Sequence, residues 1–141
     1  MIHRVLKISR WIVDFLFALK DYDREGVLAC LNEINAPGGV LGRANEIMEE
    51  RKRNRGFTYS NPELKRAVVV IGPTSSGEEF LNSFSHEIDH LTNDIADSLG
   101  IREEREGTSY LTGDTTMALA EVLCFLGCRH CRPGYDRAFR K

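Results

Sequence analysis

The run from Ala67 to Ile71 limits the fold of this sequence more than any other feature, because all of its residues are apolar. A strand that is apolar on both faces has to be covered on both sides. The turn-forming stretch from Gly72 to Ser76 follows, and Ser75 or Ser76 can cap a helix with an acidic first turn. Large apolar residues then recur at helical spacing, at Phe80, Phe84, Ile88, Leu91, Ile95 and Leu99. The sequence therefore predicts a buried strand and then an amphipathic helix over about residues 76–99.

A second strand is predicted near the start of the chain. Large apolar residues alternate along it, at Trp11, Val13, Phe15 and Phe17. This period of two predicts a strand over residues 11–17, and residues 3–8 predict another one before it. A chain of 141 residues has the length of one domain. We therefore expect one α+β domain, residues 1–141, whose small antiparallel or mixed sheet includes residues 11–17 and 67–71.

Three further helices and one loop complete the expected order of elements. A helix over about residues 23–35 is closed by Pro37-Gly38-Gly39, and another follows over about residues 41–53. Residues 56–62 carry the residues of a turn or loop. A last long helix is expected over about residues 104–128, and it bears several glutamates. The two longest helices should pack on the sheet.

Composition excludes some classes of partner. The chain is 42% hydrophobic and 28% charged, with a net charge of −2, so neither nucleic acid nor anionic lipid is expected as a partner. The apolar stretch from Trp11 to Leu19 is too short to span a bilayer and contains Asp14. No export signal accompanies the cysteines, so we expect reduced thiols and a cytoplasmic protein.

The residues His86-Glu87-Ile88-Asp89-His90 carry the predicted chemistry. Residues four apart lie on one helix face, so both imidazoles can bind one tetrahedral zinc ion. Glu87 projects beside the metal, where it can act as the general base that takes a proton from zinc-bound water. The two histidines also point away from the apolar stripe. The sequence thus predicts a catalytic zinc site with His86 and His90 as metal ligands and Glu87 as the catalytic base.

A catalytic zinc ion needs a third protein ligand, and Glu106 is the first choice. If the helix continues about nine residues past His90, the end of the helix lies about 14 Å beyond the metal. Residues 101–105, if extended, span about 16 Å and can bring Glu106 back. Glu121 is the alternative ligand. Tyr110, one turn after Glu106, is a candidate catalytic residue that donates a hydrogen bond to a developing oxyanion.

His86-Glu87-x-x-His90 followed by Glu106 resembles the gluzincin branch of zinc metallopeptidases. Two blocks, Glu79 to Glu87 and Glu106 to Gly113, are also similar to minimal metallopeptidase-like proteins of phages and mobile elements. The second block of those proteins reads Glu-x-x-Ala-Tyr-Leu-x-Gly, whereas this chain has Ser109 in place of alanine. The resemblance covers about residues 56–131. It implies a mini-zincin fold and a metallopeptidase that hydrolyses a peptide or protein substrate.

Two other interpretations remain open. The chain can be a non-catalytic zinc-binding protein with a structural or regulatory role in a phage or mobile element, or a regulatory module that binds protein or DNA.

The C-terminal cysteines and arginines have plainer interpretations. Cys124, Cys128 and Cys131 show a spacing used for iron–sulfur clusters. On or just after a C-terminal helix this spacing only places them on one face, so we expect buried thiols. A second, structural metal site would need His130 and a fourth ligand such as Cys30. The basic tail, Arg129, Arg132, Arg137, Arg140 and Lys141, is expected to be solvated.

Overall fold

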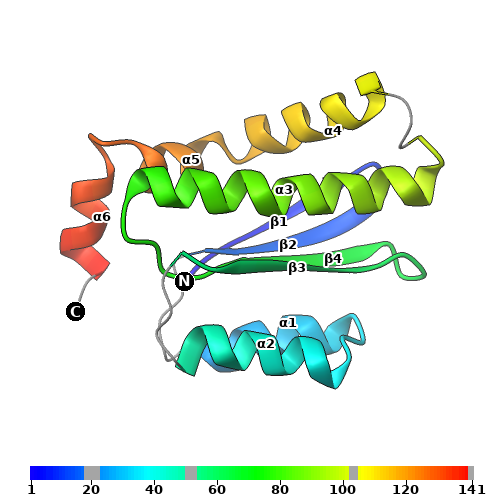
Figure 1. Cartoon of the computed structure of the whole chain (residues 1–141), viewed down its shortest axis with the longest axis horizontal. Helices are drawn as coiled ribbons and strands as arrows, with labels where there is room; N and C mark the ends of the chain where they lie inside the picture. Colours follow the sequence, from blue (N-terminus) through cyan, green and yellow to red (C-terminus); the bar gives the residue numbers. More distant parts are fainter. Residues whose placement is uncertain (18–22, 50–53, 102–104, 140–141) are drawn as a thin grey trace.

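The computed structural model is an α+β fold built on a mixed sheet (Figure 1). The structure describes residues 1–17, 23–49, 54–101 and 105–139. Its strands are β1 (Ile2–Ile8), β2 (Trp11–Phe17), β3 (Gly56–Asn61) and β4 (Arg66–Ile71), in the spatial order β1-β2-β4-β3. β2 and β4 are parallel, whereas the β1–β2 and β3–β4 pairs are antiparallel. The expected α+β class, the mixed sheet and the strands over residues 3–8 and 11–17 are confirmed.

Helices cover both faces of the sheet, as the apolar run in β4 requires. Figure 1 shows α1 (Arg24–Glu33) and α2 (Gly38–Glu49) on one face, with α3 (Gly77–Leu99), α4 (Arg105–Ala118) and α5 (Ala120–Gly127) on the other. Val68 and Val70 pack in the core under α1 and α2, while Val69 packs under α3. α6 (Arg132–Phe139) lies at one end of the molecule. In the described part of the chain, no helix combines the length and apolarity needed to cross a membrane.

The predicted helix over residues 76–99 is α3. Ser76 caps it, because its hydroxyl oxygen accepts a hydrogen bond from the Glu79 backbone N–H at 3.1 Å. The apolar stripe from Phe80 to Ile95 is buried in the core. Leu99 is instead 44% exposed. The stripe therefore fixes which side of α3 faces the sheet, and the histidine side is left toward solvent.

Two predictions about the elements before β4 are wrong. Residues 56–61 form β3 rather than a loop, because Tyr59 and its neighbours complete the ladder with β4. Pro37 lies between α1 and α2 as expected, but α2 begins at Gly38 rather than near residue 41, so the two glycines belong to the helix. The predicted end of that helix, at residues 50–53, lies outside the described residues.

The predicted helix over residues 104–128 is interrupted at Leu119, which separates α4 from α5. Thr115 and Thr116 donate side-chain hydrogen bonds to carbonyls four residues earlier in their own helix, at 2.7 and 2.8 Å. Such bonds weaken and bend helices. Because α5 then ends at Gly127, two of the C-terminal cysteines lie in a turn and not on a helix.

The start of α3 packs unusually close to the end of α5. A Cβ atom added at Gly77 would lie 2.5 Å from the Gly127 carbonyl oxygen, and one added at Gly127 would lie 2.8 Å from Leu81. The two glycines therefore permit a backbone contact that no larger residue allows.

Gly77→Ala is expected to lower the free energy of unfolding by about 1–3 kcal/mol, because the new methyl group overpacks against rigid backbone. Urea unfolding of the purified variant measures this loss. Gly113→Ala is the matched control, since Gly113 lies in α4 with nothing within 4 Å of an added Cβ. It should be neutral or stabilising by up to about 1 kcal/mol. Equal stabilities of the two variants would contradict the close contact.

Candidate functional site

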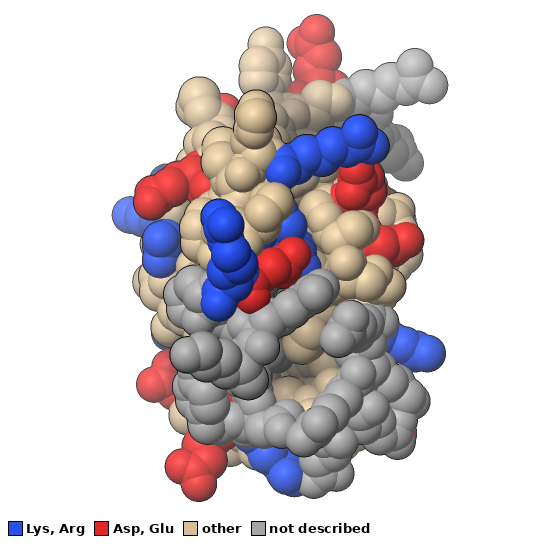
Figure 2. All heavy atoms as spheres, turned by 90° about the vertical axis from the view of Figure 1, so that its left-hand side faces the viewer, with Lys and Arg blue, Asp and Glu red and all other residues tan. Residues whose placement is uncertain are grey.

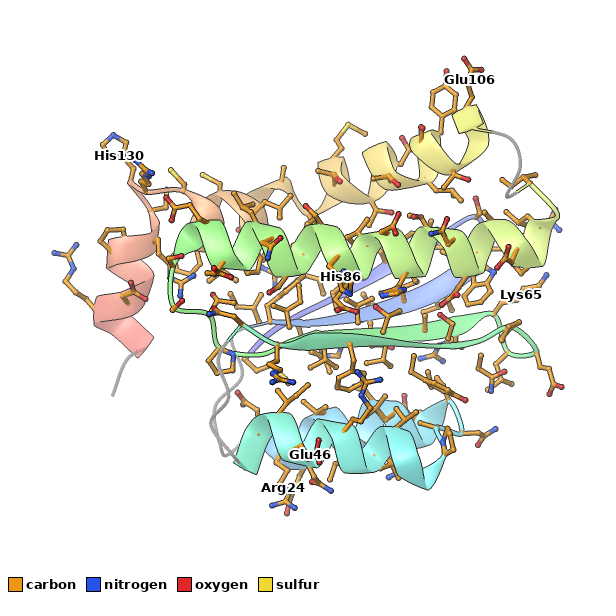
Figure 3. All side chains as sticks on the ribbon, in the orientation of Figure 1. Arg24, Glu46, Lys65, His86, Glu106 and His130 are labelled. Carbon is orange, nitrogen blue, oxygen red and sulfur yellow. The ribbon has the colours of Figure 1, made fainter. Side chains whose placement is uncertain are left out.

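The two predicted zinc-binding histidines converge on the exposed side of α3. The Nε2 atoms of His86 and His90 are 3.2 Å apart, and their rings are nearly perpendicular, with centroids 4.7 Å apart. Figure 3 shows His86 at the middle of α3. The structure therefore brings together two imidazole nitrogens that can bind one ion, as the four-residue spacing predicts.

Glu87 lies beside the histidine pair, on the side of α3 that faces β3. It is only 4% exposed, and the Thr58 hydroxyl lies 3.1 Å from its Oε1 atom and 3.2 Å from its main-chain oxygen. Gly56 packs against the other carboxylate oxygen, since a Cβ added there would lie 3.4 Å from Oε2. β3, which the sequence did not predict, therefore positions the predicted general base.

A pocket opens next to these groups, at the start of β3. It has a volume of about 300 Å³ and is lined by Asn54, Arg55, Gly56, Asn82, Ser83, His86 and Glu87. A second hollow of about 370 Å³ lies further along the same two elements, lined by Ser60, Pro62, Asp94, Asp97 and Ser98. Both hollows lie where β3 meets α3. The first pocket is thus bordered by the exposed His86 and the largely buried Glu87.

The structure does not bring the other predicted site residues to the histidines. Glu106 is exposed in the first turn of α4, and Figure 3 shows it at the far end of that helix, pointing away from α3. Glu121 is exposed in the first turn of α5, and Tyr110 is 68% exposed on α4. Among the described residues, no third metal-binding side chain joins His86 and His90.

The position of α4 explains why Glu106 is distant. The Thr112 hydroxyl of α4 donates a hydrogen bond to the Thr92 hydroxyl of α3 at 3.4 Å. At about 100° per residue, Thr92 lies about 240° around α3 from His86. α4 therefore packs on a different side of α3 from the histidines. Side chains of α4 do not reach His86 and His90 from that side.

In the part of the chain that the structure describes, His3, Asp14 and Cys30 form one of two groups of three side chains that can hold a metal ion. Asp14 is already paired, however: His3 Nε2 lies 2.8 Å from its Oδ1 atom, and Arg66 donates to its Oδ2 atom at 3.3 Å. Burial raises the pKa of the Cys30 thiol, and the charge of Asp14 raises it further. The group is therefore accounted for by contacts within the sheet, in which His3 of β1 and Arg66 of β4 pair with Asp14 of β2, and the Cys30 thiol of α1 lies next to them.

The second group is formed by Cys124, Cys128 and Cys131, whose sulfur atoms all lie within 4.8 Å of one another. The prediction of plain buried thiols is wrong, because Cys124 is exposed and the other two are half-buried. Cys30 does not join them. Backbone hydrogen bonds, first from Cys131 and then from His130, lower the pKa of Cys128, while the hydrogen bond with Cys124 raises the pKa of Cys131 to about 11.

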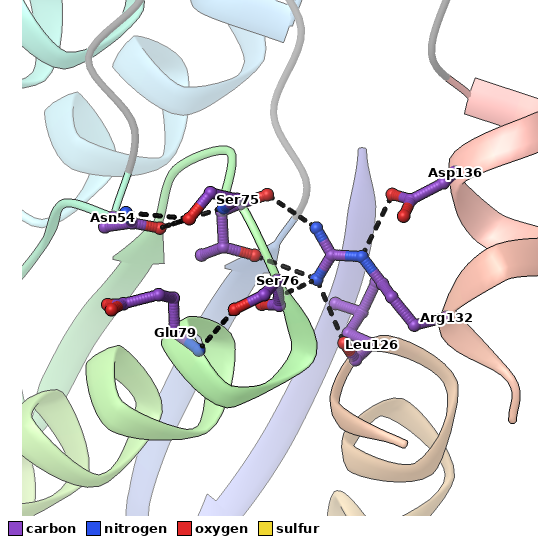
Figure 4. A network of polar contacts seen from close by, with 8 residues as sticks. Asn54, Ser75, Ser76, Glu79, Leu126, Arg132 and Asp136 are labelled. Carbon is purple, nitrogen blue, oxygen red and sulfur yellow. Dashed lines mark hydrogen bonds and ion pairs between the residues drawn. The ribbon is translucent and has the colours of Figure 1, made fainter. Parts of the chain in front are cut away.

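Arg132 is not part of a solvated basic tail. It is 6% exposed, and its guanidinium donates to the Thr74 oxygens at 2.6 and 2.9 Å and to the Leu126 carbonyl at 3.0 Å. Its Nε atom donates to Asp136 at 3.0 Å. Figure 4 shows that this network ties α6 and the end of α5 to the loop before α3. Arg132 is one of several basic residues in this run, and nothing in the sequence distinguishes it as the one that is buried.

The remaining charges near α6 are mixed in sign. Figure 2 shows acidic side chains among the Lys and Arg side chains on the end of the molecule that α6 covers. Arg129, for example, is 89% exposed and forms a 2.7 Å ion pair with Glu78. Arg129 lowers the pKa of Glu78 through this hydrogen bond. The described part of this face is therefore not a uniformly basic surface.

Comparisons with known proteins add nothing to this geometry. No model of a protein family, no curated protein and no solved structure matches the chain.

Proposed function

We propose that this protein is a zinc-dependent metallopeptidase in which His86 and His90 bind zinc and Glu87 is the general base. The separation of the two imidazoles carries the proposal. Two nitrogens on one tetrahedral zinc ion, each about 2.0–2.1 Å from it, lie about 3.3 Å apart. The two Nε2 atoms are 3.2 Å apart, a distance that also lets one imidazole donate a hydrogen bond to the other. Among the described residues only these two side chains would hold the ion, so its other positions would be taken by water or substrate.

The protein groups around this pair suit peptide hydrolysis. Zinc, when bound, polarises a substrate carbonyl and lowers the pKa of water. Glu87 accepts the proton from the attacking water and returns it to the leaving amine. The Thr58 hydroxyl and the packing of Gly56 hold the carboxylate in one orientation. A fixed base of this kind needs no reorganisation before it accepts the proton.

The seam between β3 and α3 suits an extended peptide. β3 is an edge strand, so its outer side can pair with the backbone of a bound peptide. The two hollows lie near opposite ends of β3, at Gly56 and at Ser60. Their separation along the strand, at about 3.3 Å per residue, corresponds to roughly four or five residues of peptide. Side chains on both sides of the cleaved bond would then have a place to lie.

Zinc analysis of purified protein tests the proposal. Because the three C-terminal cysteines can also take up metal, the measurement uses the C124S/C128S/C131S variant. We expect about one zinc ion per chain in this background and none after adding His86→Ala and His90→Ala, since a catalytic zinc needs its histidine ligands. Asp89→Ala, an exposed change on the same helix, is the control that should keep its zinc.

The outcomes separate the competing functions. Zinc binding together with hydrolysis of a denatured protein substrate supports a peptidase. Zinc binding without hydrolysis of any tested peptide or protein would favour the non-catalytic structural or regulatory protein. Absence of zinc from the control variant would contradict both the peptidase and the non-catalytic zinc-binding protein.

A further inference from the structure

The three C-terminal thiols have the spacing of ligands to a single ion. The Cys124 and Cys131 sulfur atoms are 3.6 Å apart, and all three sulfur atoms lie within 4.8 Å of one another. A tetrahedral zinc ion with Zn–S bonds of about 2.3 Å holds its sulfur ligands about 3.8 Å apart. In a [4Fe–4S] cluster each cysteine binds a different iron atom, which keeps the sulfurs further apart. The geometry therefore fits one mononuclear metal ion.

Backbone hydrogen bonds hold these thiols in place. The His130 backbone N–H donates to the Cys128 sulfur at 3.3 Å, and the Cys128 N–H donates to the Cys124 carbonyl at 3.1 Å. The Arg132 backbone N–H closes the turn with a 2.9 Å bond to the Cys128 carbonyl. Donors that point at a ligand sulfur favour the thiolate that binds metal. The turn between α5 and α6 is thus arranged for metal binding.

We propose that Cys124, Cys128 and Cys131 bind one thiophilic divalent ion, with zinc as the expected occupant, and that this second site fastens α6 to α5. The fourth position is open to water, because Cys124 is exposed. Soft thiolate ligands select zinc over magnesium or calcium. The site belongs to the turn after α5, whereas His86 and His90 lie on α3, so the two sites share no ligand.

The bound ion supports the Arg132 network. Cys131 precedes Arg132 directly, and the Arg132 side chain reaches back to Thr74 in the loop before α3. An ion that holds the turn between α5 and α6 in place therefore also stabilises the position of the start of α3 through Arg132. Arg132 in this role is a positioning residue, since it touches neither metal site.

Cobalt(II) titration of the reduced, full-length chain tests the site, because cobalt replaces zinc in such sites and reports thiolate ligands. Sulfur-to-cobalt charge transfer gives a near-ultraviolet band that histidine ligands do not give. We expect this band to saturate at one equivalent per chain in the wild type and in the H86A/H90A variant. It should vanish in C124S/C128S/C131S. These variants make the outcome independent of the proposed peptidase site.

Cys30→Ser is the matched control, because Cys30 is a free thiol on α1, under the other face of the sheet. The band should remain unchanged in it. Cys131→Ser alone is expected to weaken cobalt binding more than about 100-fold, since even outer-shell changes cost 10–100-fold. Circular dichroism confirms that each variant is folded. No band in the reduced wild type, a band that survives in the triple variant, or a band lost in Cys30→Ser would overturn the proposal.

Discussion

Replacing Glu87 by glutamine should lower the rate of peptide hydrolysis by about 10²–10⁴-fold, the usual contribution of a positioned general base. Glutamine has the shape of glutamate but cannot take a proton from water at neutral pH. Zinc content should stay at the wild-type level, because His86 and His90 are untouched. The measurement is hydrolysis of a denatured, fluorescently labelled protein, with zinc determined on the same sample.

The fold should tolerate this change. The Oε1 atom of Glu87 lies 3.1 Å from the Thr58 hydroxyl, and an amide oxygen accepts the same hydrogen bond. Asp89→Asn is the matched control, since it removes one negative charge from an exposed position of the same helix. We expect it to keep full activity. Equal activity in the wild type and in Glu87→Gln would end the peptidase proposal, whatever the zinc content.

The sequence correctly placed His86 and His90 on one face of a helix, because that placement needs only local information. A helix of 23 residues places positions four apart on one face wherever it packs. The apolar stripe from Phe80 to Ile95 also fixed which face was left for His86 and His90. Helix periodicity and a capping serine were sufficient for this part of the site.

The third ligand could not be predicted in the same way. The choice of Glu106 depended on the direction in which the chain returns after α3, and nothing local encodes that direction. The structure packs α4 through Thr112 and Thr92, away from the histidines. The segment between the two helices has to be long enough for Glu106 to reach the metal. Its length does not determine on which side of α3 the following helix packs.

β3 and the cysteine turn were missed for related reasons. Thr58 and Tyr59 suit a strand, but the glycine and proline at the two ends of this short segment indicated a loop. The cysteine spacing was interpreted as one helix face because the helix was expected to continue to residue 128. It ends at Gly127. The threonine hydrogen bonds within α4 are local and the contact of Gly127 with α3 is tertiary, but a hydrophobic periodicity contains neither.

Replacing Arg132 is expected to cost more stability than replacing Arg129 or Arg137, the other two described arginines of the C-terminal basic run. The buried guanidinium donates to Thr74, to the Leu126 carbonyl and to Asp136. Arg132→Ala leaves these acceptors without their donor in a water-poor site. Removing one partner of a buried charged network typically costs about 3–5 kcal/mol. Urea unfolding, with metal present at a constant concentration, measures the loss.

Arg129→Ala is the control for this prediction, because it removes the same residue type three positions earlier. Arg129 is 89% exposed and pairs with the exposed Glu78, so its loss should leave the unfolding midpoint unchanged. Arg132→Lys should behave more like alanine than like wild type. A lysine keeps the charge but lacks the planar guanidinium with its several N–H donors. Its ammonium group therefore cannot donate hydrogen bonds to Thr74, Leu126 and Asp136 at the same time.

The residues at which amide hydrogen exchange becomes faster distinguish a positioning role of Arg132 from a general loss of stability. If Arg132 fastens α6 to the loop before α3, Arg132→Lys should speed amide hydrogen exchange at residues 74–80, near the helix start, more than in the strands of the sheet. The same region should loosen when the thiols of Cys124, Cys128 and Cys131 lose their ion. Uniform faster exchange across the sheet, or equal midpoints for the Arg129 and Arg132 variants, would show that the network does not hold this helix in place.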